Sequence, residues 1–193
     1  MKLLIFVIFL FFSSNTLADK ISDIQIEGIS IGDSLLNYMS KKEILQNKEN
    51  SKEIYFYLDD TFFEVYLYND FENYEYLSFF VKSDDKNFLI QGIFGNNNFK
   101  DIDNCFETKD RILAELDPLF TKSEKITNTY NVRSDPSGKS KIYATDYILP
   151  SKDYASVECY DFHEDMQKEV NQNLVSLIVS ISTNELFNWL NNI

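Results

Sequence analysis

The one histidine of the chain lies among acidic residues. His163 has Asp161 two positions before it and Glu164 directly after it. An imidazole beside a carboxylate can act as a general base, and the same three side chains offer ligands to a metal ion. A lone histidine in a charged connecting segment is more often a surface residue than a catalytic one. We therefore predict no metal site and no cofactor, and we keep His163, Asp161 and Glu164 as the residues of a catalytic alternative.

A second possible site for chemistry is Ser134–Ser140, whose last three residues, Gly-Lys-Ser, match the end of a phosphate-binding loop. The complete motif needs a glycine five residues before Gly138, and Arg133 stands there. It also needs a helix after the loop, whereas Lys141–Leu149 alternates apolar and polar residues as a strand does. We therefore predict a hairpin turn at this segment and no nucleotide site.

Five tyrosines fall on what we expect to be one face of an antiparallel sheet. Tyrosine combines an apolar ring with a polar hydroxyl, so an exposed cluster of this kind would bind a protein partner or a small apolar or sugar-like ligand. If another part of the chain covers the cluster, it is simply core. The candidate ligand-binding residues are Tyr55, Tyr57, Tyr66, Tyr68 and Tyr76, with Phe62 and Phe80 beside them.

Alternation with period two predicts the strands that carry these residues. The expected strands are Ile54–Leu58, Phe62–Tyr68, Tyr74–Lys82 and Phe88–Phe94, followed later by Ile126–Arg133, Ile142–Leu149, Tyr154–Tyr160 and Val175–Ile181. Short polar turns between them favour antiparallel pairing. Helices are expected near residues 33–46, 104–119 and 183–191, with Lys48–Lys52 as a polar linker. The fold class is therefore α+β, mainly antiparallel sheet, with a central helix and a short C-terminal helix.

The central helix, Asn104–Phe120, is the best helical segment of the chain. Its apolar residues recur at helical spacing, and Asp103 or Asn104 is expected to cap its start. It carries Cys105, and the only other cysteine is Cys159 in the second set of strands. We predict a Cys105–Cys159 disulfide, with two buried free thiols as the alternative.

The first 18 residues have the features of a signal peptide. Lys2 precedes the ten apolar residues Leu3–Phe12, and Thr16-Leu17-Ala18 suits cleavage before Asp19. Ten residues rise only about 15 Å as a helix, half the hydrocarbon layer, so an uncleaved anchor is the weaker alternative. We expect an exported, periplasmic domain at residues 19–193 with no transmembrane segment after cleavage. It is either a single unit or two packed helix-plus-four-strand halves, 19–100 and 101–193.

The composition excludes some classes of function. The net charge is −13, without a basic stripe, so the chain repels phosphate backbones and nucleic-acid binding is not expected. Five glycines and three prolines among plentiful Ile, Val, Phe and Tyr argue against disorder.

Three segments together resemble a known group of proteins. They are the run Ile26–Leu36 (IEGISIGDSLL), the turn Asp135–Ser140 (DPSGKS) and the tripeptide Cys159-Tyr160-Asp161. They resemble uncharacterised small exported proteins of streamlined marine alphaproteobacteria. That resemblance implies a periplasmic location and carries over no functional residues, because the group has no assigned activity.

The sequence thus favours a non-catalytic binding or interaction protein of the periplasm. Its partner would be a protein or a small apolar or sugar-like ligand. The alternative is an envelope-localised enzyme that uses His163 and the nearby carboxylates.

Overall fold

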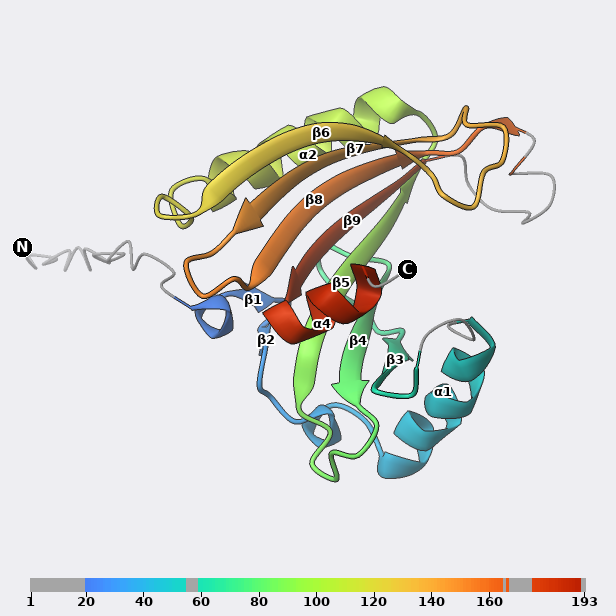
Figure 1. The fold of residues 1–193 in the computed structure, drawn as a ribbon, viewed down its shortest axis with the longest axis vertical. Helices are drawn as coiled ribbons and strands as arrows, with labels where there is room; N and C mark the ends of the chain where they lie inside the picture. Colours follow the sequence, from blue (N-terminus) through green and yellow to red (C-terminus); the bar gives the residue numbers. More distant parts are fainter. Residues whose placement is uncertain (1–19, 55–58, 165, 167–174, 192–193) are drawn as a thin grey trace, which may run out of the picture.

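The computed structural model describes residues 20–54, 59–164, 166 and 175–191. Its main feature is one seven-stranded antiparallel sheet with the strand order β3-β4-β5-β9-β8-β7-β6 (Figure 1). The strands are β3 (Phe62–Leu67), β4 (Tyr76–Lys82), β5 (Ile90–Phe99), β6 (Glu124–Asn131), β7 (Lys141–Ile148), β8 (Tyr154–Asp161) and β9 (Val175–Ser182). Strands β3 to β5 pair in chain order, and so do β6 to β9; β9 joins the two sets by also pairing with β5.

The predicted α+β class is confirmed. The strands before and after the central helix lie side by side in the same sheet, so they do not form two sheets packed face to face. The prediction of a strand at Ile54–Leu58 is wrong at its first residue, because Ile54 is the last residue of a helix. Residues 55–58 lie outside the described residues. The predicted signal peptide also lies outside them, as does most of the charged connection after Asp161.

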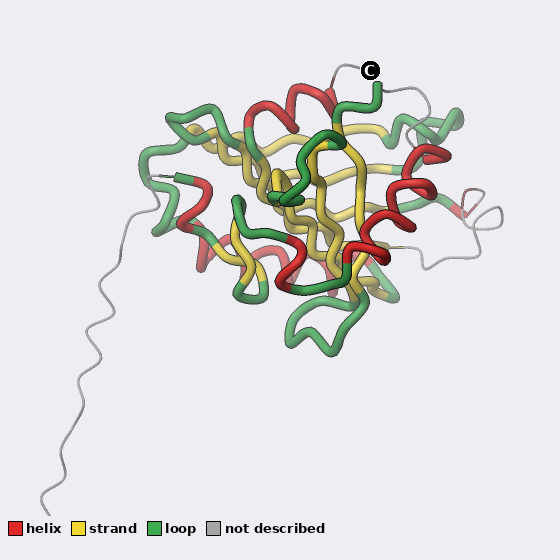
Figure 2. Tube along the Cα trace, turned by 90° about the horizontal axis from the view of Figure 1, so that it is seen from below, coloured by secondary structure: helices red, strands yellow, loops and turns green. Residues whose placement is uncertain are grey.

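Helices cover both faces and one edge of the sheet. Figure 2 shows the strands in the interior and the helices at the periphery. The helical elements are η1 (Ile21–Asp23), η2 (Leu35–Asn37), α1 (Lys41–Ile54), α2 (Ile102–Leu116) and α4 (Asn184–Asn191), and a small hairpin, β1 (Gln25–Ile26) and β2 (Ile29–Ser30), lies near the N-terminus. None of the helices in these described ranges is long and apolar enough to cross a membrane.

Helix α2 is the predicted central helix, and it packs on one face of the sheet, which we call the back face. A disulfide joins Cys105 of α2 to Cys159 of β8, as predicted. The helix begins two residues earlier than expected, because Asp101 caps it by accepting a hydrogen bond from the Asn104 N–H at 2.9 Å. The buried Lys109 adds a second link to the sheet, because its ammonium donates to the Tyr143 carbonyl of β7 at 2.5 Å.

Helix α1 corrects two predictions. The expected helix at 33–46 is a short η2 followed by α1, and the expected linker Lys48–Lys52 is part of α1. A capping box at Ser40 starts α1, since the Ser40 N–H donates to Glu43 at 2.8 Å and the Glu43 N–H donates to Ser40 Oγ. Polar side chains of α1 bind the edge strand β3: Ser51 accepts from the Glu64 N–H at 2.9 Å.

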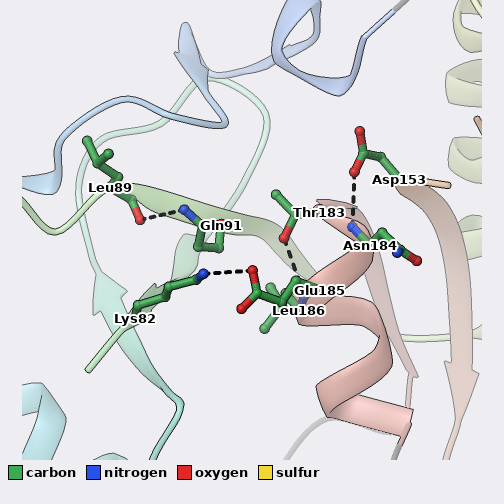
Figure 3. Close-up of polar contacts among 8 residues, drawn as sticks. All are labelled: Lys82, Leu89, Gln91, Asp153, Thr183, Asn184, Glu185 and Leu186. Carbon is green, nitrogen blue, oxygen red and sulfur yellow. Dashed lines mark hydrogen bonds and ion pairs between the residues drawn. The ribbon is translucent and has the colours of Figure 1, made fainter. Parts of the chain in front are cut away.

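Helix α4 covers part of the opposite face, which we call the front face (Figure 1). Figure 3 shows how its first turn is held. Thr183 accepts from the Leu186 N–H, the Asn184 N–H donates to Asp153 at 3.0 Å, and Lys82 pairs with Glu185 at 2.7 Å. Thr183 therefore caps the start of α4. The buried residues Phe62, Phe80, Leu186 and Trp189 form a second apolar cluster beneath the helix.

Candidate binding site

A cavity of about 590 Å³ lies on the back face, between α2, the N-terminal hairpin and the sheet. Buried apolar side chains form its floor: Ala155 of β8, with Val179 and Ile181 of β9. Polar residues of the hairpin, of the segment before β4 and of α2 surround its mouth. A concave site of this volume, with an apolar floor and a few polar groups, is typical of small-molecule binding sites.

The N-terminal hairpin is positioned by a tight two-residue turn. Glu27 and Gly28 connect β1 to β2 with φ of 53° and 76°, which matches a turn that favours glycine at its second position. The turn directs the Glu27 carboxylate to the segment before β4. There it accepts from the Glu72 N–H at 3.1 Å and from the Asn73 N–H at 2.9 Å. Two segments that are distant in the sequence are thereby fixed together at the cavity.

Tyr74 follows that segment and lines the cavity. Its ring lies against Gly95 of β5, so closely that a Cβ at Gly95 would be 2.6 Å from the ring. The pKa of Tyr74 is raised to about 12, mainly by burial and to a smaller extent by the charges of Glu27 and Glu115. The hydroxyl has no hydrogen-bond partner among the described residues, and it is therefore available to a ligand.

Helix α2 contributes one side of the mouth. Thr108, Arg111 and Glu115 line the cavity at spacings of three and four residues, which places them on one face of the helix. Ile112 and Leu116 lie beside them and continue the apolar floor. Arg111 and Glu115 are exposed, and in the described part of the chain neither forms an ion pair or a hydrogen bond through its side chain.

The predicted tyrosine face is partly present on the front face. Tyr76 contacts both Tyr66 and Tyr68, with ring centroids 6.1 and 5.3 Å apart. Tyr68 is 71% exposed, whereas Phe62 and Phe80 are buried beneath α4. The cover over these two phenylalanines is thus a helix rather than a second sheet. Tyr55 and Tyr57, the other two candidate residues, lie outside the described residues.

His163 and its neighbours lie elsewhere, at the end of β8. With Asp161 and Glu164 it lines a shallow depression of about 290 Å³, to which Lys100 and Asp101 also contribute. The backbone N–H of His163 donates to the Ser140 hydroxyl at 3.0 Å, which joins this segment to the turn before β7. No group of acidic, histidine and cysteine side chains suited to a metal ion is found in the described ranges. Catalysis at His163 stays a prediction.

A carboxylate pair on the front face was missed by sequence reasoning. The Ser156 hydroxyl lies 2.9 Å from Asp146 and 3.0 Å from Glu158, and Tyr160 donates to Glu158 at 2.8 Å. One hydroxyl proton serves only one of two carboxylates at a time. Burial raises the pKa of Glu158, and the charge of Asp146 adds to the effect. The pair is formed by cross-strand register, which alternation alone does not specify.

Comparisons of the chain with protein-family models, with curated proteins and with solved structures gave no match.

Proposed function

We propose that the protein is a non-catalytic binding protein of the periplasm and that it holds a small molecule in the cavity beneath α2. The observation that carries the proposal is the cavity itself. It combines a buried apolar floor with the side chains of Tyr74, Arg111 and Glu115, which have no hydrogen-bond or ion-pair partner among the described residues. Polar groups that converge on an apolar floor give a ligand both affinity and orientation.

Three observations support the proposed location. The Cys105–Cys159 disulfide is compatible with an oxidising compartment. The sequence begins with the features of a signal peptide, and it resembles small exported proteins at the three segments described above. Amino-terminal sequencing of protein recovered from a periplasm would test this, with Asp19 as the expected first residue.

The binding proposal is tested by filling the cavity. Ala155→Leu would place a larger side chain in the floor, and Ala114→Leu makes the same change at an exposed position of α2 that does not line the cavity. A ligand that binds the native state raises Tm with its concentration. In a thermal-shift screen of small apolar compounds, we expect hits on the wild type and on Ala114→Leu that Ala155→Leu loses. Hits that Ala155→Leu retains in full would refute binding at this site.

A second candidate is a docking surface for a protein partner at the exposed tyrosines. Tyr68 has an exposed ring packed against Tyr76, and such rings are frequent anchors in interfaces. Tyr68→Ala should then abolish capture of a specific partner from an envelope extract, while Tyr130→Ala, at the 44% exposed tyrosine of β6, should retain it. Equal capture by both variants would exclude Tyr68 as the anchor.

A further inference from the structure

The charged groups at the mouth of the cavity beneath α2 indicate the class of ligand, an inference that rests on the proposed function. The charged residues that line the cavity are Glu27, Arg111 and Glu115. The Glu27 carboxylate already accepts hydrogen bonds from the segment before β4. Arg111 and Glu115 therefore are the two charges that a ligand meets without competition from the protein.

These two charges are close to each other but are not joined in the structure. They lie one helical turn apart, where Cβ atoms are roughly 5–6 Å from each other, yet no ion pair forms between them. Their order along the helix, with the cation before the anion, is the less favourable one for an i, i+4 pair. A ligand that carries both charges would satisfy both side chains at once.

The surroundings distinguish the two ends of such a ligand. The Tyr74 hydroxyl lies in the field of Glu27 and Glu115, so that side of the cavity is negative and suits an ammonium group. Arg111 on α2 presents a planar guanidinium that suits a carboxylate. Beneath both, the buried floor of Val179 and Ile181 suits an apolar body.

We propose that the cavity binds a zwitterion with an apolar body, and that an apolar α-amino acid is the simplest such ligand. The carboxylate binds Arg111, the ammonium binds Glu115 and Tyr74, and the side chain lies on the floor. Glu115 and the net charge of −13 would repel a purely anionic ligand, and Arg111 would repel a purely cationic one. The ammonium and carboxylate groups of an amino acid are attached to the same carbon, so they are close enough to reach two side chains that lie one helical turn apart.

Three probes with the same apolar body test this proposal. They are L-tryptophan, tryptamine, which lacks the carboxylate, and indole-3-propionate, which lacks the ammonium. By titration calorimetry on the mature, disulfide-bonded protein, we expect L-tryptophan to bind about tenfold or more tightly than either analogue, since each lost charge-assisted hydrogen bond costs about that factor. L-phenylalanine and L-leucine extend the series in case the indole is too large for the floor.

Two variants assign the charges. Arg111→Gln should remove the preference for L-tryptophan over tryptamine, and Glu115→Gln should remove its preference over indole-3-propionate. Arg133→Gln and Glu124→Gln change exposed residues of the same types away from the cavity, and they should leave all three affinities unchanged.

The outcomes separate this inference from the proposed function. Tryptamine or indole-3-propionate binding as tightly as L-tryptophan, or no binding by any of the three amino acids, would overturn the zwitterion. If other apolar compounds still bind the wild type and lose binding in Ala155→Leu, the cavity remains a binding site for another class. If no compound binds in a way that depends on Ala155, the proposed function fails as well.

Discussion

Gly92 of β5 lies directly against Leu186 of helix α4. A Cβ at Gly92 would lie 2.3 Å from Leu186 Cδ2, far inside the ordinary contact distance, and 3.1 Å from the Phe94 ring. Gly92 does not have a positive φ, so the cost of Gly92→Ala comes from this contact and not from backbone strain. Overpacking of this kind costs about 1–3 kcal/mol, while the less flexible unfolded chain returns about 0.4–1 kcal/mol. We expect a net loss of about 1 kcal/mol.

A double-mutant cycle shows whether the loss comes from α4. Leu186→Ala alone should cost about 2–5 kcal/mol, because Leu186 is fully buried. In Gly92→Ala/Leu186→Ala the shortened side chain makes room for the new methyl, so the double variant should be more stable than the sum of the single changes predicts, by about 1 kcal/mol. Urea unfolding with the disulfide intact, followed by the fluorescence of the single tryptophan, Trp189 of α4, measures both quantities.

A remote pair provides the control for this cycle. Val132 is a buried residue that directly follows β6, the strand at the far edge of the sheet. Four strand spacings, or roughly 19 Å, separate β6 from β5. Gly92→Ala and Val132→Ala should therefore have additive effects. The close packing of α4 would be refuted if the effects of Gly92→Ala and Leu186→Ala were fully additive. It would also be refuted if Gly92→Ala changed neither the stability nor the emission of Trp189.

Other predictions follow from single groups. Replacing both Cys105 and Cys159 by serine should lower the free energy of unfolding in urea by about 4 kcal/mol, because the bond closes a loop with a sequence separation of 54; an unchanged midpoint would show that the bond does not constrain the chain. The raised pKa of Glu158 means that the native state holds its proton more tightly than the unfolded state does, so its contribution to stability is present below the ordinary glutamate pKa of 4.5 and is lost as pH rises through the folded pKa. Glu158→Gln should therefore gain stability relative to the wild type between pH 4 and pH 7, and a gain that shrinks over that range would contradict the sign. Tyr66→Ala should lower Tm more than His163→Ala, since Tyr66 packs on Tyr76 and donates to Glu64, and the reverse order would undercut its structural role.

Much of the sheet could be predicted from the sequence because one face of each strand is buried. Phe63, Val65 and Leu67 of β3 pack into the main core, as alternation predicted, while Glu64 and Tyr66 on the opposite face bond to each other. The disulfide was predictable because the chain has only two cysteines and the features of an exported protein.

Helix α1 could not be predicted to its full length because it binds through polar side chains. Ile44 is buried, but Asn47 and Ser51 face β3 and accept hydrogen bonds from backbone N–H groups of its edge. A helix that packs in this way lacks the apolar periodicity from which helices are predicted. Its second half, including Lys48–Lys52, therefore had the composition of a linker.

The cavity could not be predicted because segments distant in the sequence form it. The hairpin at Glu27, the segment at Tyr74, helix α2 and the inner strands meet there only in the folded chain. The sequence of α2 carried no signal of it, because exposed charged residues such as Arg111 and Glu115 beside apolar ones occur in any amphipathic helix that packs on a sheet.

Native mass spectrometry of the mature protein purified from a periplasm tests the central claim most directly, because it reports whether a small molecule occupies the cavity beneath α2. We expect an added mass on the wild type and on Ala114→Leu, retained from the periplasm or restored by millimolar L-tryptophan, and no added mass on Ala155→Leu. The same added mass on Ala155→Leu would contradict the account, as would none on any of the three proteins in the presence of either apolar amino acids or the compounds of the thermal-shift screen.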